Sequence, residues 1–147
     1  MAIVLKTRYN AIEDKILEYI QGMDDWDSTN SQKGMRGYPS TGPPWLFILE
    51  DPIDSPPADL GGHARVTMQF TIFIRVDDDT MTGDSSVARL ARDYMFDVYN
   101  ELINYKSLGG LCEEFFCVRL YPSYEVRGND GIAMAGVALV YIARKRL

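Results

Sequence analysis

Histidine and cysteine, which most often build metal and nucleophilic sites, are nearly missing from this sequence. Its 147 residues include one histidine, His63, and two cysteines, Cys112 and Cys117. The cysteines lack Cys-x-x-Cys spacing and partner histidines, so we expect free thiols rather than a zinc or redox site. His63 lies in a Gly-Gly-His-Ala stretch with no nucleophile turn nearby, which gives a Ser-His-Asp triad no support. We therefore expect no catalytic or metal-binding centre.

Phosphate-binding motifs and an excess of positive charge are also missing. The sequence contains neither Gly-x-Gly-x-x-Gly nor a phosphate-binding Gly-Lys-Ser/Thr, so nucleotide binding has no support and no cofactor is expected. The net charge of −6 disfavours binding of nucleic acid through a broad basic face. The run Arg144-Lys145-Arg146 is a local exception, which we interpret as a solvated strand end.

Long apolar runs are the third absence. No stretch reaches the roughly 20 apolar residues of a membrane span. The opening Met-Ala-Ile-Val-Leu-Lys leads into an amphipathic pattern rather than a signal peptide. We expect a protein that is made and kept in the cytoplasm, with no membrane partner. A hydrophobic content of 46% suits one domain over 1–147, with long loops at 23–44 and 52–62.

The strongest pattern that is present is an alternating run over Arg65–Val76. Every second side chain from Val66 to Val76 is apolar, and the side chains between them are mostly polar. This period of two predicts a strand, and at about 3.3 Å per residue it would be roughly 40 Å long. Such a length exceeds the usual strand of about five or six residues. The strand must overhang its own domain or be covered by another chain.

Two further segments show helical periodicity. Ile3–Ile20 places isoleucine and leucine at spacings of three and four, which predicts an N-terminal amphipathic helix. Ser86–Tyr105 carries a longer apolar stripe from Val87 to Tyr105 and is followed by Gly109-Gly110, a helix stop signal.

Extended runs make up the rest of the predicted structure. Pro43-Pro44 introduces a short strand, Trp45–Leu49, which we expect to pair antiparallel with the long strand. Phe115–Tyr121, interrupted at Pro122 and continued by Tyr124–Arg127, is joined through a turn to a central strand over Ile132–Ala143. The fold class is therefore α+β, with an antiparallel or mixed sheet of about four main strands and two helices packed against it.

An acidic run, Asp77-Asp78-Asp79, follows the long strand. Carboxylates suit Mg²⁺ or Ca²⁺, but the alternating oxygen ligands, glycine and terminal glutamate of a calcium loop are missing. We interpret the run as a solvated acidic turn.

The loop from Met23 to Pro44 contains large side chains that a solvated tether would not need. Two interpretations stay open: an arm docked on a partner, which we prefer, and a loop folded back on its own domain. Aromatic and arginine side chains are favoured where proteins meet. Together with the acidic run, they define an expected protein–protein interface: Trp26, Met35, Tyr38, Arg65, Phe73, Arg75, Asp77, Asp78, Asp79, Tyr121, Tyr124, Arg127 and Tyr141.

The order of these elements resembles the tail terminator, or tail completion, proteins of tailed bacteriophages and related contractile-tail particles. The corresponding pieces are Ile3–Ile20, Trp45–Leu49, Arg65–Val76, Ser86–Tyr105 and Phe115–Ala143. The resemblance implies an α+β subunit of a homo-hexameric ring at the head-proximal end of a tail. Such a ring stops tail-tube polymerisation, offers a docking face to the head or neck connector, and lets genome DNA pass without specific binding.

The same resemblance implies a virion protein of the tail neck, assembled in the cytoplasm of a host bacterium, with the tube protein and a neck connector as partners. The loop at Met23–Pro44 is longer than in the shorter members of the family. Three alternatives stay open: another neck protein for head closure or head–tail joining, a small α+β ligand-binding module with a pocket between helix and sheet, and, third, a hydrolase.

Overall fold

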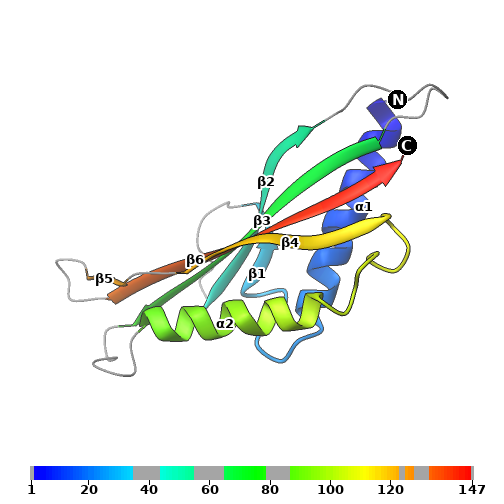
Figure 1. Ribbon diagram of the computed structural model, residues 1–147. Helices are drawn as coiled ribbons and strands as arrows, with labels where there is room; N and C mark the ends of the chain where they lie inside the picture. The colour runs from blue at the N-terminus through cyan, green and yellow to red at the C-terminus, as the bar shows by residue number, and fades with distance from the viewer. Residues whose placement is uncertain are drawn as a thin grey trace.

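The computed structural model describes residues 2–34, 44–54, 65–78, 87–122, 125–127 and 133–146. Within these residues, two helices and six strands follow one another (Figure 1). Their bounds are α1 Ala2–Gln21, β1 Ser31–Lys33, β2 Trp45–Asp54, β3 Arg65–Asp78, α2 Val87–Leu102, β4 Glu114–Tyr121, β5 Glu125–Arg127 and β6 Ala133–Arg146.

One mixed sheet contains all six strands in the order β1-β2-β3-β6-β4, with β5 also paired to β6. β1 runs parallel to β2, and the other pairs are antiparallel. The predicted α+β class, the pairing of β2 with β3 and the central position of the last strand are confirmed. The three-residue β1 was not predicted.

The middle of the sheet is a long two-stranded ribbon of β3 and β6. Each strand has 14 residues, and they pair without a register shift from Arg65 with Arg146 to Asp78 with Ala133. At about 3.3 Å per residue, the ribbon is roughly 46 Å long. It extends beyond α2 at one end of the molecule and beside α1 at the other (Figure 1).

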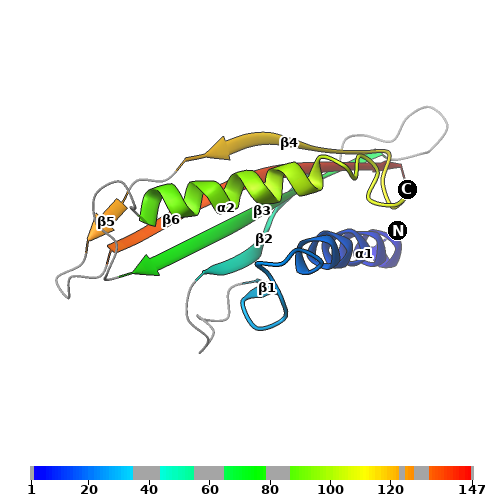
Figure 2. The same cartoon turned by 90° about the horizontal axis from the view of Figure 1, so that it is seen from below.

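Both helices cover the same face of the sheet (Figure 2). On β3, the predicted alternation is confirmed, because Val66, Met68, Phe70, Ile72, Ile74 and Val76 are all buried in the core. From α1, the Tyr9 ring stacks on Phe70 with the ring centroids 4.8 Å apart. We call the opposite side, where Phe73 and Arg75 lie, the helix-free face.

β2 is longer than the predicted Trp45–Leu49. It continues to Asp54 through an irregularity in its pairing between Glu50 and Ile53. Pro52 lies in that irregularity and cannot donate a ladder hydrogen bond, so it interrupts the pairing without ending the strand. The rest of the predicted loop at 52–62 falls outside the described residues from 55 onward.

The turn from α2 to β4 depends on backbone conformations with positive φ. α2 ends at Leu102, three residues before the predicted end, and the chain then turns through Leu108, Gly109 and Gly110 with φ of 48°, 68° and 91°. Leu108 is fully buried, which holds a non-glycine residue in this left-handed region. The turn delivers the chain to the start of β4.

Candidate protein–protein interface

The two edges of the sheet differ in how they are protected. β1 covers only Leu46–Ile48 of β2, and the outer half of β2 carries the irregularity, Pro52 and three acidic residues of the sequence. Bulges, proline and charge are the usual means by which an edge strand avoids pairing with another chain. β4 ends the sheet on the other side, and its residues 116–121 contain no proline. Among the described residues, the β4 edge is therefore the one open to another chain.

Apolar side chains are exposed along this edge. Within the described residues, the large hydrophobic side chains classed as exposed all belong to α2, the residue after it, or β4. We call them the β4 flank: Phe96, Ile103, Phe116, Val118 and Tyr121, whose exposed fractions run from 37% to 52%. Phe96 and Ile103 are seven residues apart and so lie on one side of the helical spiral, away from the buried stripe that ends at Leu102.

β4 contains one extra residue relative to β6. Cys117 pairs with Tyr141 and Arg119 pairs with Val140, which leaves Val118 without an opposite residue. The bulge changes which residues share a face. Phe115, Cys117 and Leu120 pair with β6 residues of the helix-covered face, whereas Phe116, Arg119 and Tyr121 pair with residues of the helix-free face.

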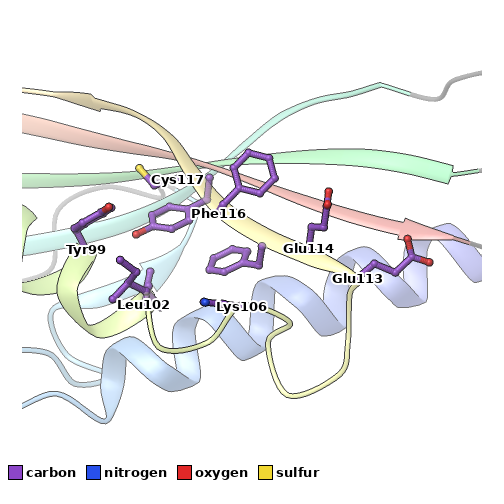
Figure 3. Close-up of a pocket in the computed structure, with 10 residues that line it drawn as sticks. Tyr99, Leu102, Lys106, Glu113, Glu114, Phe116 and Cys117 are labelled. Carbon is purple, nitrogen blue, oxygen red and sulfur yellow. The ribbon is translucent and has the colours of Figure 1, made fainter.

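A hollow of about 470 Å³ lies between the end of α2 and β4, next to the flank (Figure 3). Most of its lining is apolar or aromatic: Tyr99, Leu102, Ile103, Lys106, Glu113, Glu114, Phe115, Phe116, Cys117 and Tyr141. The Glu113 and Glu114 carboxylates point away from the rings (Figure 3). The backbone carbonyl of Lys106 accepts a 2.8 Å hydrogen bond from the Phe115 N–H, which closes this end of the β4 edge.

Tyr141 places a buried hydroxyl at this hollow. The residue is 2% exposed, its ring stacks on Phe115 at 4.8 Å, and its Oη has no hydrogen-bond partner among the described residues. Burial raises the pKa of the Tyr141 hydroxyl, and the neighbouring Cys117 and Tyr99 raise it further. The hydroxyl therefore stays protonated and can donate to an acceptor brought by another molecule.

Two arginines lie over aromatic rings of the flank. The Arg119 guanidinium is 5.7 Å from the Tyr121 ring centroid, and its Nη1 donates a 3.0 Å hydrogen bond to the Tyr121 hydroxyl. Arg144 lies 5.3 Å from the Phe116 ring centroid and forms an ion pair with Glu114 at 3.0 Å. These contacts hold the two exposed rings in place before any partner arrives.

The other side of α2 is acidic. A second hollow, of about 440 Å³, is lined by Gly22, Met23, Asp24, Asp25, Asp97, Asn100 and Glu101. The two sides of the same helix therefore present unlike surfaces, one apolar and one acidic.

The structure places two of the expected interface residues in the core. Trp26 is 1% exposed, and its ring meets Tyr94 edge-on at 5.4 Å. The start of the 23–44 loop is thus folded back on its own domain, and the preferred interpretation, an arm docked on a partner, is wrong for Trp26. Tyr141 is buried at the hollow rather than exposed on the hairpin, because it lies on the helix-covered face of β6 and its ring stacks on Phe115.

Arg75 and Asp77 form a contact within β3. Arg75 Nε and Nη2 donate to the two carboxylate oxygens of Asp77 at 2.7 and 2.9 Å, and the guanidinium lies 5.9 Å from the Trp45 ring centroid. β3 continues to Asp78, so Asp77 and Asp78 belong to a strand and not to the expected turn. The strand continues because both residues pair with β6.

The remaining expected interface residues differ in position. Phe73 is half-buried on the helix-free face and stacks with Phe47 at 6.4 Å, and Tyr121 is 46% exposed on the β4 flank. Arg65, Asp78 and Arg127 have described backbone in strands, but their side chains lie outside the described part. Met35, Tyr38, Asp79 and Tyr124 lie outside it altogether.

Sequence reasoning missed four of the five flank residues. Phe96 and Ile103 could have been found from their spacing outside the buried stripe of α2, and Phe116 and Val118 from the apolar character of both faces of that strand. They were missed because the sequence does not give the order of the strands. An apolar strand is unusual only when it lies at a sheet edge.

The described residues contain no group of three or more His, Cys, Asp or Glu side chains that could hold a metal ion. His63 and Asp79 lie outside those residues. No helix within the described segments is long and apolar enough to cross a membrane.

The two cysteines are free, as expected, and Cys112 is buried. Burial raises the pKa of the Cys112 thiol from 9.0 to about 11. The unfolded chain therefore loses this proton first, so stability should fall between about pH 9 and pH 11. We expect wild type to lose about 2 kcal/mol more than Cys112→Ala between pH 8 and pH 10.5. Urea unfolding at both pH values measures this difference, and equal losses would contradict it.

No protein-family model matches the sequence, and no curated protein matches it. Among solved structures, a chain of the "Virion of native gene transfer agent (GTA) particle" is similar, with 11% sequence identity, 92% of each chain covered and a TM-score of 0.43. A likeness of this extent carries no argument for a function, so the geometry of the β4 flank has to supply it.

Proposed function

We propose that the protein is a structural subunit of a tail terminator ring in a tailed phage or phage-like particle. In this proposal, residues 1–147 form one domain. Six copies close into a ring in the neck of the particle, where the ring ends tube polymerisation and receives the head connector. The work is done by shape and binding rather than by a chemical step.

The observation that carries the proposal is the β4 flank. An open sheet edge bearing exposed Phe116, Val118 and Tyr121 would be a hazard in a protein that remains monomeric, because such edges pair with other chains. A subunit that is covered by neighbours in its final assembly has a use for this surface. Because of this edge we favour an assembly role over an enzymatic one.

The two sides of α2 are compatible with a ring contact. A ring of identical subunits is held by a heterologous contact, in which two different surfaces of each subunit meet. The apolar side of α2 at Ile103 and its acidic side at Asp97 are different surfaces of this kind. The net charge of −6 also suits a channel that passes DNA without holding it.

The test is to add the purified protein to growing tail tubes made from the tube protein encoded in the same genome. We expect rings on tube ends and an early stop to elongation, both seen by negative-stain electron microscopy. Val118→Lys should abolish ring formation, because a charge on an edge strand opposes pairing. Ser28→Lys, which adds the same charge at an exposed position preceding β1, should leave rings intact.

Wild-type protein that neither forms rings nor changes tube length would overturn the proposal. Rings that bind the portal and ignore tubes would identify a head-closure or head–tail joining protein instead.

One observation favours a second candidate, a small ligand-binding module outside phage. The 470 Å³ hollow has the volume of a small-molecule site, and the buried Tyr141 hydroxyl lacks a partner there among the described residues. A ligand screen by protein-observed NMR would support this candidate if a small aromatic compound bound wild type and not Leu102→Trp, which fills the hollow.

A further inference from the structure

All the exposed large apolar side chains of the described residues lie on a single flank, and this restricts what can cover it. A contact between the β4 flank and any other described surface of a second copy would bury apolar side chains on one side only. A contact between two β4 flanks buries them on both sides. Such a contact is isologous, with the same surface contributed by each copy.

We infer that the free protein forms a two-fold dimer in which two β4 strands pair antiparallel, and that this dimer keeps the β4 edge covered until the ring assembles. Its role as a storage form rests on the proposed ring function. The dimer itself is a property of the isolated chain.

The bulge at Val118 restricts the register. Opposed residues in an antiparallel pair place their side chains on the same side of the sheet. Because the bulge shifts the alternation by one residue, the faces of two β4 strands match when Phe116 opposes Tyr121 of the partner subunit. Cys117 then opposes Leu120 of the partner subunit on the helix-covered face. Any register shifted by one residue would put these side chains on opposite faces.

This register pairs aromatic side chains with aromatic side chains on the helix-free face. The Phe116 and Tyr121 rings are 37% and 46% exposed, and each would cover the other across the new strand pair, twice in the dimer. Aromatic pairs across strands stabilise the pairing beyond simple burial. Leu120 of the partner subunit would approach the hollow from the Cys117 side, since Cys117 lines it.

The surface available predicts a weak dimer. From typical side-chain areas, the five flank residues expose roughly 400 Å² in each copy. The total for two copies, roughly 800 Å², lies below the roughly 1,000 Å² of stable specific interfaces and in the range of weak, transient contacts. We therefore expect dissociation in the micromolar range, which suits a contact that must open when the ring forms.

One pairing in this register is unfavourable. Val118 opposes Arg119 of the partner subunit, so the two Arg119 guanidiniums lie near the two-fold axis. Salt screens repulsion between exposed like charges. We expect added salt to strengthen the dimer, whereas a contact held by ion pairs would weaken.

Disulfide trapping tests the register directly. Phe116→Cys and Tyr121→Cys are made separately in a Cys117→Ser chain, mixed, and oxidised. We expect a cross-linked dimer from the mixture only, because opposed residues have Cα atoms about 4.5 to 5.5 Å apart, within reach of a disulfide. In this register the two copies of residue 116 are five positions apart along the strands, so Phe116→Cys alone should not cross-link. Ile103→Cys mixed with Tyr121→Cys is the control, with a more exposed cysteine on the turn after α2.

Sedimentation of the unmodified chain provides the second measurement. Wild type should change from monomer to dimer as concentration rises through the micromolar range, and Val118→Lys should stay monomeric while keeping its helical circular dichroism. A wild-type chain that stays monomeric throughout, or cross-linking in all mixtures alike, would overturn the dimer. Rings on tube ends without a free dimer would refute the dimer and leave the ring proposal standing, and a dimer that ignores tubes would do the reverse.

Discussion

Replacing Trp26 with alanine is expected to lower the free energy of unfolding by about 3 to 5 kcal/mol. The indole is 1% exposed, is among the largest fully buried side chains of the described residues, and meets the Tyr94 ring edge-on at 5.4 Å. Alanine would lose the burial of the ring and leave a cavity that the flanking elements fill only in part. Urea unfolding followed by far-ultraviolet circular dichroism measures the change.

The matched control is Trp26→Phe. The Trp26 Nε1 is buried without a hydrogen-bond partner among the described residues, so phenylalanine removes a polar group whose desolvation is uncompensated while retaining most of the apolar surface. We expect it to cost less than half of the alanine loss. If alanine cost under 1 kcal/mol, the start of the 23–44 loop would not be part of the core.

The second large effect is expected at Leu108. Leu108→Ala should cost about 2 to 5 kcal/mol, because the side chain is fully buried. Leu108→Gly removes even more of the side chain, yet it should be less destabilising than alanine by about 1 kcal/mol. The φ of 48° at this position is unfavourable for alanine and freely available to glycine.

This order of stabilities separates backbone strain from packing. Both substitutions empty nearly the same space, and glycine empties slightly more, so a more stable glycine variant reports the conformation of the turn. Calorimetry of the two variants measures it. Should glycine prove less stable than alanine, the strain assigned to Leu108 would be absent. The opposite order is expected at Ala91, which is buried inside α2. Ala91→Gly should be less stable than the wild-type chain, since glycine is the poorer helix former.

The alternation over Arg65–Val76 was enough to predict β3, because one face of that strand is buried under helices and the pattern has a period of two. The stripe of α2 was readable for the same reason. β1 could not be read from Ser-Gln-Lys. β1 is stabilised by hydrogen bonds to β2. The Leu46 N–H donates to Asn30 O and the Gly34 N–H donates to Ile48 O, each at 2.8 Å.

The candidate interface was harder to predict than the fold. Trp26 and Tyr141 were chosen because they are aromatic, but aromatic side chains serve cores as well as interfaces, and only the tertiary arrangement decides between them. Phe116 and Val118 look like core residues in the sequence. They are exposed in a strand that lies at the end of the described sheet, where Phe116 is on the helix-free face and Val118 is in the bulge without an opposite residue.

The unbroken β3–β6 ladder has a mechanical consequence. Hydrogen bonds of an antiparallel pair lie across the strands. A load applied between the Asp78 end of β3 and the Arg146 end of β6 shears all of these bonds at once, whereas a load between Asp78 and Ala133 peels them one after another. Neighbouring subunits bound at opposite ends of the ribbon would therefore meet high mechanical resistance. A force applied at one end alone would break the hydrogen bonds one after another at a lower load.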